Sequence, residues 1–337
     1  MKKLTTLLTA LLLVTLLSGC AGLLTLIASA LAVGEMYGQV TDFLGLDNTD
    51  YTLYLDGYNM GIHPDPDGTL DLAGLPVGDH VLTLASDDKR VGFSINTSII
   101  ENQQVNLGQV TPLQGGTIEG RLQRVVGSSQ VPLAGVRVAA ILGGASLVTA
   151  GNSPIALPAG SGKTVILGFT DTNGDYKLGP AQFGQWIVTS AYPAYYTDAR
   201  IVNVSSGNDA DGANLLLRPD SAAPGSATLR GTVTAQNGGA LSEALVAATL
   251  LTPFAPEVDP ARLPTLQTQV GSELMAQPWF RWRTLATVTA NSGAYDFEVP
   301  PGPQSIYAFK FGYRAQAVEV TPDAGVAQTL DFALPHR

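Results

Sequence analysis

The chain of 337 residues is 45% hydrophobic and 14% charged, which argues against a wholly disordered protein and leaves room for two or three domains. Its formal net charge of −10 would repel phosphate backbones, so the composition disfavours a nucleic-acid-binding protein. The single cysteine excludes an internal disulfide and a multi-cysteine zinc site, and three histidines leave little material for a histidine-rich metal centre.

The first twenty residues have the pattern of a secretory signal. A short basic start, Lys2-Lys3, precedes an apolar run at 4–17 that is interrupted only by threonine and alanine. The ending L-S-G-C at 17–20 resembles the signal of bacterial lipoproteins, in which the cysteine is diacylated and becomes the mature N-terminus. This resemblance implies a signal peptide at 1–19, a lipid on Cys20, and a place on the extracytoplasmic side of a membrane in the bacterial cell envelope.

The chain after Cys20 stays apolar. No charged residue occurs between Leu4 and Gly34, and this stretch exceeds the ~20 residues that a membrane-spanning helix requires. We predict a lipidated apolar tether at 20–34, and an uncleaved transmembrane helix is the alternative. In both cases the membrane is a partner, and the folded part lies outside the cytoplasm.

The remainder of the chain repeats one pattern three times. A glycine-centred turn followed by alternating apolar residues occurs at 65–70, 171–176 and 290–295. A second glycine follows nine or ten residues after the turn glycine, at Gly78, Gly184 and Gly302. Period-two alternation bounded by Gly, Pro, Asn and Asp predicts short strands joined by hairpins. Since no long stretch of the repeats has helical periodicity, we predict an all-β protein.

These motifs resemble those of the carboxypeptidase regulatory-like domain. The resemblance rests on P-L-x-G-V-x-V at 132–138, T-D-x-N-G-x-Y at 170–176, and glycines that open a strand and a return. It implies a transthyretin-like fold, which is close to the Cna-B-type domains of bacterial surface proteins. We therefore expect three tandem Ig-like or transthyretin-like β-sandwiches, at 35–113 (the divergent one), 117–219 and 227–335. Segments of linker composition separate them at 111–116 and 219–226.

No arrangement of residues indicates an enzyme. None of His63, His80 and His336 belongs to an H-x-x-E or H-E-x-x-H pattern, so the resemblance extends to the accessory module of the carboxypeptidase and not to its catalytic one. No nucleophile and base have a recognisable spacing either. We predict a non-enzymatic protein without a cofactor.

One turn has the spacing of a partial calcium loop. Asp171, Asn173 and Asp175 are placed like the first ligands of an EF-hand. However, position six should be Gly and is Tyr176, and position twelve should be Glu and is Gln182. The third repeat keeps this turn with residues that cannot coordinate a cation. The sequence therefore leaves two alternatives, a surface calcium site and a turn that forms without metal.

A long insertion at 252–283 interrupts the third repeat. It holds two of the three tryptophans, and loops longer than ~12–15 residues inside a compact domain are usually functional or disordered. Its candidate ligand-binding residues are Trp279, Phe280, Arg281 and Trp282. Aromatic rings beside an arginine could stack on a sugar or anchor a partner protein, and packing against the end of the sandwich is the alternative.

Two functions fit this sequence. In the first, a membrane-anchored envelope lipoprotein uses its β-sandwiches as a non-enzymatic scaffold or interaction stalk for another envelope protein. In the second, the protein binds a polysaccharide through the aromatic loop of its third domain. The sequence indicates neither the oligomeric state nor the angles between the three domains.

Overall fold

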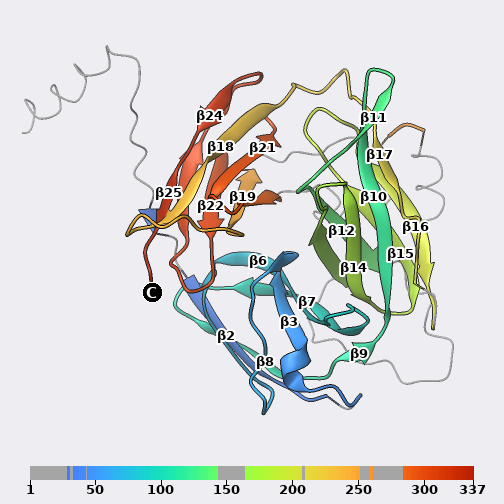
Figure 1. Cartoon of the computed structure of the whole chain (residues 1–337), viewed down its shortest axis with the longest axis vertical. Coiled ribbons are helices and arrows are strands. Elements are labelled where there is room, and N and C mark those ends of the chain that lie inside the picture. The colour runs from blue at the N-terminus through green and yellow to red at the C-terminus, as the bar shows by residue number, and fades with distance from the viewer. Residues whose placement is uncertain are drawn as a thin grey trace, which may run out of the picture.

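The protein is built almost entirely of β-strands (Figure 1). The structure, a computed structural model, describes residues 29–30, 33–42, 44–142, 164–206, 209–250, 259–261 and 284–337. Within these ranges the one helical element is a single 3-10 turn, η1, at Asn48–Asp50. The predicted all-β fold class is therefore confirmed. No helix of the described ranges is long and apolar enough to cross a membrane.

The first pair of sheets lies between residues 33 and 114. One sheet has the order β5-β2-β8 and consists of Thr69–Pro76, Val33–Val40 and Gln104–Val110. The other has the order β4-β3-β6-β7-β9 and consists of Tyr58–Asn59, Tyr51–Leu55, Gly78–Ser86, Val91–Ile99 and Leu113–Gln114. Because alternate side chains of each strand face the opposite sheet, Met36, Leu72 and Leu82 are fully buried between the two sheets.

The second pair of sheets follows directly. In one sheet β10 lies at the centre, with β11, β14 and β17 along it; these strands are Gly116–Val126, Ser129–Pro132, Asp175–Ala181 and Leu215–Leu217. The other sheet has the order β13-β12-β15-β16 and consists of Val165–Phe169, Arg137–Leu142, Gly184–Ser190 and Asp198–Val204. Trp186 is fully buried between these two sheets, where it packs in the hydrophobic core.

The third pair of sheets closes the chain. In one sheet β18 pairs with β21, β24 and β25; these strands are Ala227–Ala235, Ala294–Val299, Ala327–Thr329 and Phe332–Leu334. The other has the order β1-β23-β22-β19-β20 and consists of Ser29–Ala30, Gln316–Val320, Gln304–Phe309, Leu245–Leu250 and Thr284–Val288. In all three pairs a late strand returns parallel to the first one, as β8 does beside β2.

The predicted turn recurs with the same geometry in each pair. The turn glycines have φ of +87°, +76° and +77°, at Gly68, Gly174 and Gly293. Each glycine N–H donates to the carbonyl three residues earlier, at 2.7, 3.0 and 2.8 Å. Glycine reaches this left-handed conformation without steric cost, which explains its presence at all three turns. The internal repeat read from the sequence is therefore also a repeat of backbone structure.

One sheet of the third pair is covered on both of its faces. Along β19, Val246 and Ala248 pack inside the third pair, whereas Leu245 and Ala247 belong to the core of the first pair. Phe309 of β22 also lies in that first core, and the Tyr58 hydroxyl donates to the carbonyl of Glu243 at 2.5 Å. The first and third pairs thus share one continuous hydrophobic core.

The first and second pairs meet through close backbone contact. A Cβ atom at Gly57 would lie 2.7 Å from the backbone nitrogen of Gly168, and the Ser94 hydroxyl donates to the carbonyl of Val165 at 2.6 Å. The three pairs consequently form one compact body around a common junction (Figure 1). A row of sandwiches, as a stalk would require, is not the observed arrangement.

The predicted boundaries differ from the structure in two places. Gln114, expected after the end of the first domain at 113, belongs to β9 (Leu113–Gln114), which pairs with Val91 and Gly92 of the first pair. Ser29–Ala30, expected in the tether at 20–34, forms β1 and pairs with Ala317 and Gln316 of the third pair. Both segments therefore belong to the packed body.

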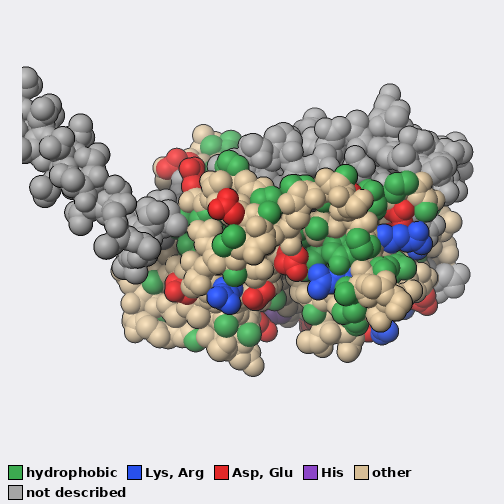
Figure 2. Space-filling model, turned by 90° about the horizontal axis from the view of Figure 1, so that it is seen from above, with side chains coloured by type: hydrophobic (Ala, Val, Ile, Leu, Met, Phe, Trp, Pro, Cys, Tyr) green, Lys and Arg blue, Asp and Glu red, His purple; other side chains and the backbone are tan. Residues whose placement is uncertain are grey.

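The surface carries no single concentration of charge on the face that Figure 2 shows. Among the described residues visible there, acidic and basic side chains are scattered between polar and apolar ones.

Candidate functional site

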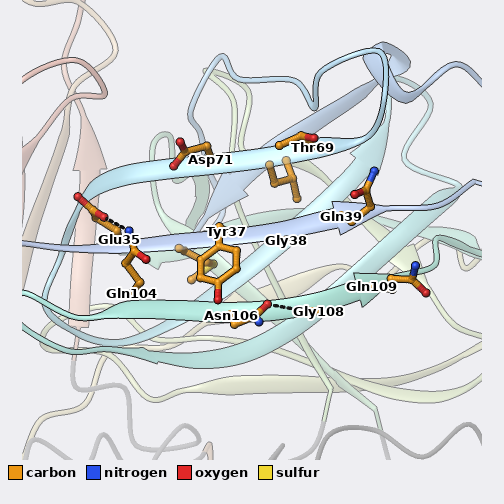
Figure 3. Close-up of a pocket in the computed structure, with 12 residues that line it drawn as sticks. Glu35, Tyr37, Gly38, Gln39, Thr69, Asp71, Gln104, Asn106, Gly108 and Gln109 are labelled. Carbon is orange, nitrogen blue, oxygen red and sulfur yellow. Dashed lines mark hydrogen bonds between the residues drawn. The ribbon is translucent and has the colours of Figure 1, made fainter.

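The outer surface of the sheet β5-β2-β8 is hollowed (Figure 3). The hollow has a volume of about 540 Å³. Strand alternation places Met36 in the core and turns its neighbours Glu35 and Tyr37 toward solvent. We refer to this surface as the polar face; its side chains are those of Glu35, Tyr37, Gln39, Thr69, Asp71, Gln104, Asn106 and Gln109.

Hydrogen bonds hold three amide side chains of the polar face in place. The Gln39 Nε2 donates to the carbonyl of Asp67 at 2.6 Å, and the Gln104 Nε2 donates to the Glu35 carboxylate at 2.7 Å. The Asn106 Oδ1 accepts from the backbone N–H of Gly108 at 2.7 Å. Each amide keeps its other polar atom available, so the face presents oriented donors and acceptors.

Tyr37 lies in the middle of these amides (Figure 3), and its side chain is 41% exposed. A tyrosine ring surrounded by amides and carboxylates can pack against the C–H face of a sugar while the amides bond to its hydroxyl groups. Thr69 adds a hydroxyl group to this face, and Glu35 and Asp71 add carboxylates.

A second group of polar residues is buried where the three sheet pairs meet. We refer to Asp56, His80 and Arg137 as the junction cluster; they are 7%, 7% and 6% exposed. The His80 Nδ1 lies 2.7 Å from the Asp56 carboxylate, and its Nε2 lies 2.9 Å from the carbonyl of Pro76. Since both ring nitrogens face an acceptor, both must carry a proton, and His80 is an imidazolium.

The charges of Asp56 and His80 sustain each other, whereas Arg137 favours the charged form of Asp56 and disfavours that of His80. Burial alone would lower the pKa of His80, but the Asp56 carboxylate and the Pro76 carbonyl outweigh burial and raise it. Burial would likewise raise the pKa of Asp56, but His80, Arg137 and the N–H of Val81 together lower it. Asp56 and His80 therefore stay charged in the interior, as buried ion pairs do when further hydrogen bonds satisfy them.

Two of the predicted sites fall outside the described residues. They are the lipidation site Cys20 and the aromatic group Trp279, Phe280, Arg281 and Trp282. Both stay predictions.

The third predicted site, the turn at Asp171, Asn173 and Asp175, is described and has other bonding partners. Asp171 accepts hydrogen bonds from the backbone N–H groups of Asn173 and Asp175, at 2.8 and 2.9 Å. The Asp175 carboxylate forms a two-bond ion pair with Arg121, at 2.6 and 2.9 Å. The described residues contain no group of three His, Cys, Asp or Glu placed to hold a metal ion. The calcium site stays a prediction, and the turn forms in this structure through its own hydrogen bonds.

Sequence reasoning missed both the polar face and the junction cluster. The polar face could have been predicted from the sequence, because Glu35, Tyr37 and Gln39 take every second position along one strand. For the cluster, the Asp56-Gly57 pair indicates a two-residue hairpin, but nothing in the sequence links it to Arg137 of the next repeat.

Known proteins match this chain only at low similarity. No protein-family model matches the sequence, and no curated protein matches it. Among solved structures, the TIE protein of Bacillus anthracis is 11% identical over 90% of this chain and 51% of its own, with a TM-score of 0.22. This chain thus spans about half of that protein.

Two further solved structures have similar scores. A streptococcal ancillary pilin is 10% identical over 90% of this chain and 99% of its own, with a TM-score of 0.23. A putative carbohydrate-binding protein of Pseudomonas aeruginosa is 16% identical over 31% of this chain and 88% of its own, with a TM-score of 0.20. These scores carry no inference about function, and the resemblance to the carboxypeptidase regulatory-like family stays a prediction.

Proposed function

We propose that this protein is a non-enzymatic scaffold of the bacterial cell envelope, anchored to a membrane through a lipid on Cys20. The observation that carries the proposal is the shared core of the first and third sheet pairs, to which Phe309 and Leu245 contribute. A body whose lobes cannot move freely presents its surfaces at constant relative positions, as a scaffold must. The ending L-S-G-C at 17–20 supports the anchor.

Replacing Cys20 with alanine is expected to abolish incorporation of a labelled fatty acid, so that no lipid-modified form of the protein is made. Acylation needs the thiol of this residue, and the chain has no second cysteine to replace it. The measurement is metabolic labelling followed by separation of membrane and soluble fractions. Ser18→Ala, which keeps a small residue before the thiol, serves as the control and should still be labelled. A native chain that incorporates no label would rule out the lipid anchor.

The polar face supports a second function, binding of a carbohydrate. The sugar-binding surface proposed here is the face around Tyr37, and the aromatic loop at 252–283 stays a separate prediction. What supports it is the combination of an exposed ring with amides whose orientation is held, at Gln39, Gln104 and Asn106. Preorganised polar groups bind hydroxyl-rich ligands with less loss of side-chain entropy.

Replacing Tyr37 with alanine is expected to weaken glycan binding by about tenfold, since loss of an aromatic contact costs on the order of 1–2 kcal/mol. The measurement is a glycan array followed by calorimetric titration of the bound sugar. Phe183→Ala is the matched control, because Phe183 is 42% exposed, close to the 41% of Tyr37, but belongs to the second sheet pair. Equal loss in both variants, or silence across the array, would exclude the polar face as a sugar site.

A further inference from the structure

A cleft separates the second sheet pair from the third. Its volume is about 260 Å³, room for roughly nine waters at the ~30 Å³ that each occupies in the liquid. The second pair contributes Arg124, Arg137 and Tyr192 to its lining, and the third contributes Thr287 and Glu298. Two arginines therefore line one small cleft in a protein whose net charge is −10. We refer to it as the arginine cleft.

Arg137, which lines this cleft, has hydrogen-bond donors that no described residue uses. It is 6% exposed, and its guanidinium lies 5.3 Å from the centre of the Phe169 ring. Its Nε and Nη2 have no hydrogen-bond partner among the described residues. These two nitrogens lie on one edge of the guanidinium, the edge that binds both oxygens of a carboxylate. A buried charged donor without a partner is costly, so this edge is a site where an acceptor would stabilise the protein.

Arg124 has a similar environment on the other side of the cleft. Its guanidinium lies 5.2 Å from the centre of the Tyr192 ring and 5.7 Å from that of Tyr195. Its Nε is buried without a partner in the described part of the chain. Its Nη1 lies 3.5 Å from the Glu298 carboxylate, at the long end of an ion pair. The rings fix the plane of the guanidinium, while Glu298 satisfies only a part of its donors.

We propose that the arginine cleft binds a small organic carboxylate, with Arg124 and Arg137 as its anchoring side chains. The planar carboxylate matches the unused edge of Arg137, which offers two parallel donors. Glu298 and Asp296 also line the cleft, and their charges disfavour a dianion such as phosphate. The Arg137 edge is shielded from solvent, so side chains of the cleft must rotate away from it when the ligand enters. Once reached, this edge binds an anion in surroundings where water competes little.

Removing the charge of Glu298 is expected to change ligand affinity in a direction that a purely structural role of this residue would not produce. In the ligand-free protein it competes for Arg124, and it repels an incoming anion. Removing its charge should therefore tighten carboxylate binding, although the same change removes an ion pair from the folded protein. Stability and binding are expected to move in opposite directions.

The test is calorimetric titration of the full chain with sodium acetate, sodium propionate and inorganic phosphate at constant ionic strength. Acetate or propionate, each with a single negative charge, is expected to bind, and phosphate to bind more weakly. Arg124→Gln should weaken carboxylate binding by about tenfold, the loss of one charge-assisted hydrogen bond. Glu298→Gln should tighten it by about threefold, the scale of one partly exposed ion pair. Arg121→Gln, on the exposed ion pair with Asp175, is the control and should bind like the native chain.

Arg124 and Glu298 are used for the test because both are partly exposed at the cleft, so their variants are expected to fold, and a thermal unfolding curve verifies this. Three results would overturn the proposal. The first is no heat with either carboxylate, the second is unchanged affinity in folded Arg124→Gln, and the third is weaker binding in Glu298→Gln.

Discussion

Replacing Asp56 with asparagine is expected to lower the free energy of unfolding by about 3 kcal/mol, because removing one partner of a buried ion pair leaves the other charge uncompensated. Asp56 lies 2.7 Å from His80, and both side chains are buried. Asparagine keeps the acceptor for the Val81 N–H and tolerates the φ of +52° at this turn. The substitution therefore tests the charge without disturbing the hairpin. Urea unfolding measures the loss.

The same pair makes stability depend on pH in both directions. The pKa of His80 is raised in the folded protein, so its contribution is complete below about pH 6.5, its unfolded value, and is lost as pH rises through the folded pKa. The pKa of Asp56 is lowered, so its contribution is complete above about pH 4 and is lost as pH falls through the folded pKa. We expect the stabilisation to be greatest between these limits.

The control for this prediction is Asp71→Asn on the exposed polar face, which should change stability by less than about 0.5 kcal/mol. In Asp56→Asn the loss of stability as pH rises above about 6.5 should disappear, since burial lowers the pKa of His80 once the Asp56 carboxylate is gone. A native-like profile in this variant, or an unchanged free energy of unfolding near pH 5, would contradict the assignment of a charged pair.

Replacing Phe309 with alanine is expected to cost about 3–5 kcal/mol and to loosen two sheet pairs together. Phe309 is 1% exposed, belongs to a strand of the third pair, and lies in the core of the first pair. Its ring meets that of Tyr58 edge to face, with centroids 6.1 Å apart. Loss of the ring opens a cavity between the two pairs. Hydrogen exchange should show weaker protection in β3 and β6 as well as in β22.

Phe332 is the matched control for Phe309. It is also 1% exposed in the third pair, but its core contains no residue of the first pair. Phe332→Ala should therefore reduce protection of β18 and β25 more than that of β3 and β6. If both variants leave exchange in the first pair unchanged, the two pairs are not coupled by the shared core.

The repeat was readable from the sequence because its determinants are local. The turn glycines Gly68, Gly174 and Gly293 need a left-handed backbone, and the residues after them alternate. Turn geometry and the facing of alternate side chains depend on neighbours in the chain. These features therefore predicted the all-β class and the three turns. The hairpins expected at these turns are wrong, because each turn joins strands of two different sheets, as between β13 and β14.

The contacts between repeats were not readable in the same way. The run Leu245-Val246-Ala247-Ala248 is apolar at every position, and a strand of this kind is buried on both faces. Such a run indicates that something covers the second face but not what covers it. Only the folded chain shows that the first sheet pair does so.

The candidate sites also differ in whether local sequence could predict them. The polar face lies on one sheet of the first pair. Three of its side chains, those of Glu35, Tyr37 and Gln39, follow from the alternation of residues along one strand. The junction cluster joins Asp56 to Arg137 of the next repeat, and the arginine cleft joins residues more than a hundred positions apart, such as Arg124 and Glu298. Their chemistry arises from packing between repeats, which no local pattern records.

By itself, then, the sequence determined the signal-like N-terminus, the strand-and-turn repeat and the absence of a recognisable catalytic pattern. Each of these depends on residues close together in the chain. The tertiary structure decided that the three sheet pairs form one body, and it brought Asp56, His80 and Arg137 into one buried cluster. The physical reason is that burial and electrostatic pairing act between surfaces, and the chain order does not specify which surfaces meet.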